Sequence, residues 1–267
     1  MNKKISIVMA YHNRKSQLLF TLKTIKKSSH KNIEVIIVDD NSDKDHQLDN
    51  DDITKYSFPI KYIKFNRTNE KSINPCVVYN RGFKEVTGDI IVIQNPECCH
   101  IGDVIKYVDD NLKINEYYSF SCANIFYEEL NNELYKNYNK GTELNFIDSL
   151  PDIGTFYNKT YCLKWYNHPI HRPTGFHFLS AIYKSDLDKL KGFDERYEFG
   201  SSYDDVELVE RVKFNNIILK IIGPINSPFV VHQWHKKTTK YNDGHLSEIN
   251  RLILNDHMKE LGINIMF

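Results

Sequence analysis

Residues 34–42 read EVIIVDDNS, an apolar run rich in β-branched residues that ends at once in a polar turn. Such a run is typical of a strand buried on both faces, as strands are in parallel sheets covered by helices. Two similar runs, ISIVMA at residues 5–10 and IIVI at residues 90–93, are also followed by polar residues. Because ligands of open α/β sheets bind at the carboxyl ends of strands, these polar residues are the first candidates for a site.

The segments between these runs have the patterns of helices and of a further strand. Residues 16–28 place leucines and an isoleucine at helical spacing, and residues 60–65 have the composition of a third strand in chain order. Pro75 suits the first turn of a helix running to Val86, because its missing N–H group costs nothing there. Strands that alternate with amphipathic helices predict a doubly wound, mostly parallel α/β sheet flanked by helices.

The second half of the chain is less regular. Residues 128–146 are polar and aromatic and are predicted to form a surface excursion or flexible loop. Acidic residues open a predicted helix over residues 204–214, where the helix dipole favours them. The other expected elements are strands over 178–183, 217–222 and 229–231, and helices over 185–190, capped by Ser185, and over 246–261. Since neither a repeat nor a linker is visible, we expect a single domain over residues 1–267.

Composition excludes several classes of protein. The 267 residues include 35 basic and 35 acidic side chains, and this zero net charge argues against nucleic acid as a partner. The first apolar run is too short for a signal peptide, and no run approaches the roughly 18 apolar residues of a membrane span. We therefore expect a cytoplasmic protein without an integral membrane segment. The five cysteines, without a CxxC motif, are expected to be buried free thiols.

Carboxylates follow two of the predicted strands. Asp39 and Asp40 come after residues 34–38, where an acid can accept hydrogen bonds from a ribose hydroxyl or a base N–H group. The structural alternative is a turn or helix cap. Glu97 comes after residues 90–93, where a carboxylate can bind a hard cation that bridges two phosphates, or can simply close a surface turn.

Two further groups lie in the second half. His232 and His235 follow a strand-like run and can add nitrogen ligands, which Mn²⁺ tolerates better than Mg²⁺ does; a structural histidine is the alternative. Asp204 and Asp205 open a predicted helix after the sequence EFGSSY. One of these acids can take a proton from an acceptor hydroxyl, and complementing the helix dipole is the alternative.

The chain resembles the family 2 glycosyltransferases with the GT-A fold, from about residue 4 to about residue 235. The resemblance rests on five segments in this order: ISIVMAYHNR, IEVIIVDDNS, VTGDIIVIQNPE, GFDERYEFGSSYDDVELVERV and VVHQWH. It implies a nucleotide-sugar-binding half over about 1–100, an acceptor-binding and catalytic half with a smaller mixed sheet over about 101–240, and a C-terminal helix over 241–267. The donor-binding residues that it implies are Ala10, Tyr11, Asn13, Asp39, Asp40 (the expected contact to the base), Arg81 and Asn95.

The resemblance also implies a metal site that departs from the family pattern. The family's motif, usually Asp-x-Asp or Asp-Asp, falls on Asn95-Pro96-Glu97, so that only Glu97 keeps a carboxylate. The expected cofactor, Mn²⁺ or Mg²⁺, then depends on Glu97 together with His232 or His235.

The family's Glu-Asp pair falls on Asp204-Asp205. By resemblance, Asp205 is the expected base and Asp204 a contact to the acceptor hydroxyl, while the segment from His168 to His177 shapes the acceptor side. The expected reaction moves a sugar from a nucleotide-sugar donor, preferably a UDP-sugar, to a glycan, protein or small-molecule acceptor. Inversion at the anomeric carbon is expected, although the same fold supports retention.

Two other functions are weighed against this one. A non-catalytic module that binds a glycan or a nucleotide sugar is favoured by the missing Asp-x-Asp motif. A nucleotidyltransferase is disfavoured, because residues 10–17 read AYHNRKSQ and lack the glycine-rich basic signature typical of that class.

Overall fold

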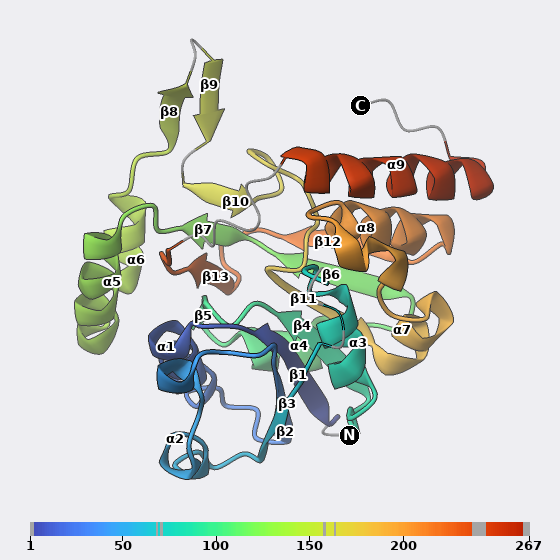
Figure 1. Ribbon diagram of the computed structural model, residues 1–267. Helices are drawn as coiled ribbons and strands as arrows, with labels where there is room; N and C mark the ends of the chain where they lie inside the picture. The colour runs from blue at the N-terminus through green and yellow to red at the C-terminus, as the bar shows by residue number, and fades with distance from the viewer. Residues whose placement is uncertain are drawn as a thin grey trace.

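The computed structural model describes residues 3–67, 69, 72–156, 159–162, 164–236 and 244–263, and among these it describes 153–156 and 159–162 by their backbone alone. Among these residues the central sheet has seven strands in the order β12-β6-β11-β4-β1-β2-β3 (Figure 1). Neighbouring strands are parallel except at β11, which is antiparallel to β4 and β6, so the expected mostly parallel sheet is confirmed. The strands are β1 Ile5–Tyr11, β2 Ile33–Asp39, β3 Ile60–Lys64, β4 Ile90–Gln94, β6 Glu116–Phe120, β11 Leu179–Tyr183 and β12 Ile218–Ile222.

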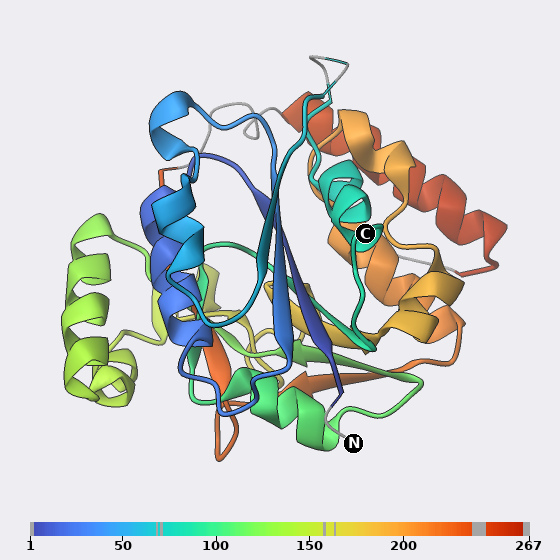
Figure 2. The same ribbon diagram turned by 90° about the horizontal axis from the view of Figure 1, so that it is seen from below.

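Helices cover both faces of this sheet, because side chains on a strand alternate between the faces. Ile7 and Met9 of β1 belong to the core beneath α1 and α4, whereas Val8 belongs to the core beneath α3. Figure 2 shows the blue α1 and the teal α3 on opposite sides of the strands. The helices are α1 Lys15–Ile25 and α4 Val104–Asn111 on one side, and α3 Cys76–Phe83, α7 Lys184–Leu190, α8 Asp204–Phe214 and α9 Gly244–Glu260 on the other.

A second, smaller sheet of mixed direction lies beside the first, as expected. Its order is β10-β7-β13-β5, with β13 antiparallel to β5 and parallel to β7. Its strands are β5 Cys98–Ile101, β7 Cys122–Asn124, β10 Trp165–Asn167 and β13 Phe229–His232. An antiparallel ribbon of β8 (Ile153–Phe156) and β9 (Lys159–Cys162) projects from the body in Figure 1. The short helices are η1 Lys44–His46, α2 Asn50–Thr54 and η2 Glu195–Phe199.

Residues 128–146 form two helices, α5 (Glu128–Lys140) and α6 (Glu143–Asp148), so the prediction of a surface excursion or flexible loop was wrong. Leu134 and Tyr138 lie one helical turn apart and are both buried in the core beside the second sheet. This apolar stripe is narrow, and most other positions of α5 are polar. Packing against the second sheet therefore stabilises a helix whose composition alone looks like that of a loop.

Other element boundaries differ by a few residues. Helix α7 begins at Lys184 without a side-chain cap, so Ser185 is not the capping residue. Helix α3 ends at Phe83, before the predicted Val86. Four cysteines are buried and free, as expected, and the side chain of the fifth lies outside the described residues: the buried ones are Cys76, Cys98, Cys99 and Cys122.

Gly82 allows α3 to lie close to the sheet. A Cβ atom at this position would lie 2.5 Å from Cγ1 of Val8 and 3.1 Å from Cγ2 of Val38. We expect Gly82→Ala to lower the free energy of unfolding by about 1–3 kcal/mol, the usual cost of overpacking a core. Urea unfolding of the purified chain measures this difference.

The matched control is Gly244→Ala, because a Cβ atom at Gly244 meets no described atom within 4 Å. This control is expected to unfold at the wild-type urea concentration or above it. Equal unfolding midpoints for Gly82→Ala and wild type would show that α3 shifts to accommodate the methyl group.

Candidate active site

A cleft of about 930 Å³ opens at the carboxyl ends of β1, β2 and β4. It also receives the start of α8 and the residues that follow β13. Most of the predicted site residues line it: Ala10, Tyr11, Asn13, Asp40, Asn95, Glu97, His177, Asp204, Asp205, His232 and His235. The expectation that polar residues at parallel strand ends would gather at one place thus agrees with the structure.

The two aspartates after β2 have different surroundings. Asp39 is buried; its carboxylate accepts a hydrogen bond from the backbone N–H of Ser42 at 2.9 Å and one from the hydroxyl of Tyr62. It closes the turn and does not line the cleft. Asp40 lines the cleft, and its two oxygens accept hydrogen bonds from Nε and Nη2 of Arg67, both at 2.7 Å. Such a paired arrangement holds the Asp40 carboxylate in one orientation.

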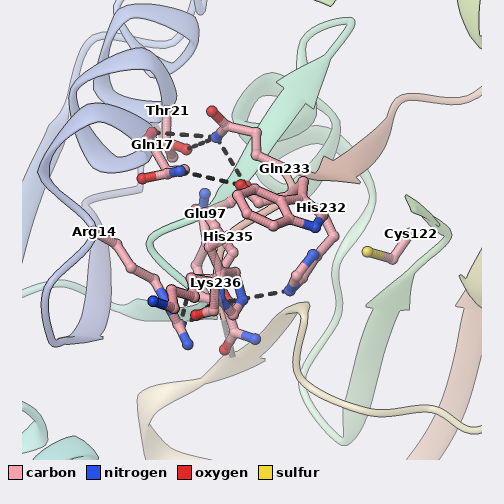
Figure 3. Close-up of polar contacts among 12 residues, drawn as sticks. Arg14, Gln17, Thr21, Glu97, Cys122, His232, Gln233, His235 and Lys236 are labelled. Atoms are coloured by element: carbon pink, nitrogen blue, oxygen red, sulfur yellow. Dashed lines mark hydrogen bonds and ion pairs between the residues drawn. The ribbon is translucent and has the colours of Figure 1, made fainter. Parts of the chain in front are cut away.

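Glu97 is the centre of a buried cluster (Figure 3). Its carboxylate accepts two hydrogen bonds of 2.9 Å from Nη1 of Arg14, and its Oε1 lies 3.1 Å from Nε2 of His232 and 3.6 Å from Nε2 of His235. Burial opposes ionisation of Glu97, but the charge of Arg14 and the hydrogen bond from His232 outweigh it and hold the pKa of this carboxyl well below its usual range. The cluster therefore contains an ionised carboxylate.

Pairing in the second sheet explains why these distant residues meet. In the β5–β13 register, His232 stands opposite Cys98, the residue after Glu97. The backbone N–H of Gln233 donates to the carbonyl of Glu97 at 3.1 Å, and its side-chain amide donates to the same carbonyl at 2.9 Å and to Oγ1 of Thr21 at 3.1 Å (Figure 3). The buried Gln233 thus ties the Glu97 backbone to α1.

The cluster has the chemistry and spacing of a cation site. One carboxylate oxygen and two imidazole nitrogens lie within 4.8 Å of one another. Bonds of about 2.1 Å to a single octahedral ion place neighbouring ligand atoms about 3 Å apart, close to the distances from Glu97 to the two histidines. Burial lowers the pKa of His235 to about 4, so its ring is neutral near pH 7, as a metal ligand must be. Glu97, His232 and His235 therefore fit a divalent cation.

The acid pair lies in the first turn of α8. Asp204 is buried and accepts a hydrogen bond of 3.0 Å from the side-chain amide of Asn74. Burial and the neighbouring charge of Asp205 raise the pKa of Asp204 above its usual range. Asp205 is less buried and forms an ion pair with Nδ1 of His177, whose ring packs edge-on against Tyr79 at 5.1 Å. Asp205 is therefore the acid that is open to the cleft.

The charge of Asp205 also acts on His177. Burial alone would lower the pKa of this histidine, but the adjacent carboxylate overrides it, and the pKa is raised. The pair can thus hold a proton at Nδ1 of His177 close to the Asp205 oxygen.

Besides Asp39, two predicted residues lie away from the cleft. Arg81 of α3 pairs with Glu85, which follows the end of that helix. His168 accepts hydrogen bonds at Nδ1 from the backbone N–H groups of Ile170 and His171 at 3.1 and 3.2 Å, which closes a local turn. The structure does not bring these side chains to the rest of the site.

Four contributors were missed from the sequence. Arg14, Arg67, Asn74 and Gln233 each contact a predicted site residue. No motif marks them, and their partners lie between 27 and 136 positions away in the chain. Arg14 was the only one of the four whose position in the sequence pointed to the site, because it belongs to the polar residues that follow the first predicted strand.

Part of the sequence matches a known protein family. The sequence pattern described as "Glycosyl transferase family 2" matches residues 6–185. The chain belongs to glycosyl transferase family 2. The matched part contains Asp40, Glu97 and His177, whereas the acid pair and His232 lie beyond it.

Known relatives agree with this family. A curated dolichol-phosphate mannosyltransferase from Pyrococcus furiosus is 30% identical over 111 residues, which are 41% of this chain and 30% of that protein. The mannosyltransferase PcManGT from Pyrobaculum calidifontis, solved with GDP-Man and Mn²⁺, superposes with a TM-score of 0.55 at 13% identity. Residues 1–349 of TarS from S. aureus, solved with UDP-GlcNAc, superpose with a TM-score of 0.64 at 12% identity.

These two structures establish the GT-A fold expected for this family 2 member. They match 99% and 98% of this chain, and 66% and 68% of their own chains. The chain thus spans about two thirds of the solved chains and under a third of the curated mannosyltransferase. No helix in the described parts of the chain combines the length and apolar character needed to cross a bilayer.

Proposed function

We propose that the chain transfers a sugar from a nucleotide-sugar donor to a hydroxyl acceptor with the help of a divalent cation. One observation carries this proposal: a single cleft contains both the cation-type cluster of Glu97, His232 and His235 and the acid pair of Asp204 and Asp205. A cation site suits a departing diphosphate, and a carboxylate open to the cleft suits deprotonation of an acceptor. Either group alone would support a much broader range of functions.

The donor is assigned to the carboxyl ends of β1 and β2. Ala10, Tyr11 and Asn13 would line the base and ribose, and Asp40, held by Arg67, would accept a hydrogen bond from the base. Because the two similar structures hold GDP-Man and UDP-GlcNAc, the fold accepts more than one nucleotide. We propose UDP, on the family resemblance, with GDP as the alternative to be tested.

The cation, Mn²⁺ or Mg²⁺, would be held by Glu97, His232 and His235. When bound, it supplies positive charge to offset the negative charge that develops on the leaving diphosphate. Asn95 lines the cleft beside this cluster, and Tyr79 donates a hydrogen bond of 2.9 Å to its side-chain oxygen. This bond holds the Asn95 amide in place next to the expected donor.

Asp205 is assigned as the base. Its carboxylate would take the acceptor proton while the acceptor oxygen attacks the anomeric carbon from the side opposite the diphosphate, which gives inversion. Asp204, with its raised pKa, would hold the acceptor hydroxyl by a hydrogen bond. His177 would orient the Asp205 carboxylate through their ion pair.

A non-catalytic nucleotide-sugar-binding module is the alternative, and one contact favours it. Arg14 already neutralises Glu97, the carboxylate of the cation cluster. Release of nucleotide from a UDP-sugar or GDP-sugar, with or without an acceptor, separates the two functions. A binding module would retain the donor unchanged.

Thermal unfolding with nucleotides tests the donor site directly. We expect UDP to raise the melting temperature of the chain in the presence of Mn²⁺, and to raise it less when the ion is removed with EDTA. A ligand at 100 times its Kd stabilises the folded state by about 2.7 kcal/mol, which is readily measured. GDP, CDP and ADP serve as matched ligands.

A larger shift with GDP would change the proposed nucleotide but keep the site. The absence of a shift with any nucleotide at millimolar concentration would contradict the donor site.

A further inference from the structure

The backbone immediately before the acid pair has an uncommon conformation. Ser202 and Tyr203 have φ angles of 63° and 67°, in the left-handed region that residues with a Cβ atom seldom occupy. Tyr203 is also the N-cap residue of α8, and it makes no side-chain cap hydrogen bond. Two such residues in succession persist only where the surrounding structure holds them.

Helix α9 contacts this segment from outside. The side-chain amide of Asn250 donates hydrogen bonds to the carbonyl of Tyr197 at 3.1 Å and to the carbonyl of Ser202 at 2.9 Å. The backbone N–H of Ser201 donates to the carbonyl of Leu246 at 3.0 Å. Asn250 is fully buried, and a buried amide is costly unless it is hydrogen-bonded. Its two donated bonds are therefore the reason that an amide is tolerated here.

Gly200 brings the two backbones together. A Cβ atom on Gly200 would lie 2.1 Å from Oδ1 of Asn250 and 2.7 Å from the carbonyl oxygen of Leu246. The segment therefore lies directly on α9, and position 200 has no room for a side chain.

The opposite side of the segment contacts the cleft. The carbonyl of Glu198 accepts hydrogen bonds from the backbone N–H groups of Ile73 and Asn74, at 2.9 and 3.0 Å. Asn74 in turn donates its side-chain amide to Asp204. The segment from 197 to 203 is thus held between α9 and the residue that contacts the buried acid.

We propose that Asn250 is a positioning residue: by bonding to both ends of the segment, it holds the left-handed turn at Ser202 and Tyr203 and so fixes where Asp204 and Asp205 stand in the cleft. Asn250 itself is not among the residues that line the cleft. The role in transfer rests on the proposed function, whereas the hold on the turn does not.

The test compares Asn250→Ala with Met258→Ala. Met258 is buried on the same helix, two turns further along; it shares a core cluster with Tyr197, but no hydrogen bond among the described residues joins it to the segment. We expect Asn250→Ala to lower kcat by on the order of 10²-fold, the usual cost of a misplaced catalytic group, with little change in the KM for the donor. Met258→Ala is expected to lower the melting temperature but to keep kcat. Asn250→Ser, a smaller polar residue that donates at most one hydrogen bond, serves if the alanine variant does not fold.

Hydrogen–deuterium exchange gives a second readout that needs no activity. Amides of residues 197–205 are expected to exchange at least about tenfold faster in Asn250→Ala, whereas those of Met258→Ala keep the wild-type rate. Adding Ser202→Gly to Asn250→Ala should recover part of the lost kcat, because glycine adopts the left-handed turn without steric cost.

The proposal would be overturned if residues 197–205 of Asn250→Ala exchanged at the wild-type rate. It would also be overturned if Asn250→Ala had the same kcat as Met258→Ala. If the wild-type chain transfers no sugar from any donor, the proposed function fails, and the exchange rates still decide whether Asn250 holds the turn.

Discussion

Replacing Asp205 with asparagine is expected to reduce sugar transfer by about 10²–10⁴-fold, because general-base catalysis contributes that much to a reaction. Asparagine keeps the shape of the side chain, and its oxygen can still accept a hydrogen bond from Nδ1 of His177. It cannot take the acceptor proton near neutral pH. Nucleotide binding should stay at the wild-type level, since Asp205 lies apart from the Asp40 and Glu97 contacts.

Two further variants of α8 test whether the loss of transfer is specific to Asp205. Asp204→Asn removes the buried acid and is expected to raise the KM for the acceptor more than it lowers kcat. Glu210→Gln removes an acid of the same helix that pairs with Lys213 at 2.7 Å outside the cleft, and should leave transfer unchanged. Rates are measured as nucleotide release with saturating donor. If Asp205→Asn kept transfer within a few-fold of wild type, Asp205 would not be the base.

Replacing Glu97 with glutamine is expected to remove the effect of Mn²⁺ on nucleotide binding and to lower transfer strongly. The variant keeps the size of the side chain but loses the carboxylate charge of the cation cluster and the partner of Arg14. Divalent cations prefer charged oxygen ligands, so two imidazoles alone bind Mn²⁺ weakly. Calorimetric titration with Mn²⁺, followed by thermal unfolding with UDP, measures both effects.

Arg14→Ala is the matched variant for Glu97→Gln. Both variants break the contact between Arg14 and Glu97, but they are expected to change Mn²⁺ affinity in opposite directions. Without the guanidinium, the charge of the Glu97 carboxylate is no longer offset by Arg14, so Mn²⁺ affinity is expected to rise. A loss of Mn²⁺ binding in Arg14→Ala and wild-type binding in Glu97→Gln would place the cation elsewhere. A general loss of folding would instead appear as a lower melting temperature in both variants without ligand.

Local composition was sufficient for β1, α1, β2, β3, α3 and β4 in the first half, and for α8. The runs at 5–10, 34–38 and 90–93 are almost entirely apolar and rich in β-branched residues, which is typical of strands covered on both faces. Helix α8 has the predicted bounds, Asp204–Phe214, because its acidic start and apolar spacing agree. Helix α5 was missed because packing against the second sheet, rather than its own pattern, selects its conformation, and β5 was missed because its pairing with the distant β13 defines it.

The candidate site was predictable in part for the same reason. Parallel strands all end at one edge of a sheet, so residues that directly follow strands, such as Tyr11, Asp40 and Glu97, are brought together without knowledge of their contacts. The same rule could not show that Asp39 turns away from the cleft, because that orientation depends on its bonds to Tyr62 on β3 and to the backbone N–H of Ser42.

The sequence by itself determined the parallel sheet, the edge at which a ligand binds, and the presence of carboxylates there, since each depends on residues close together in the chain. Only the tertiary structure decided which side chains meet. The β5–β13 register places His232 beside Glu97, and Arg67 reaches Asp40 across the loop after β3. It also places Asn250 of α9 against the turn before the acid pair. These contacts join residues far apart in sequence. Their pairing depends on sheet register and helix packing, which cannot be predicted from the composition of short segments.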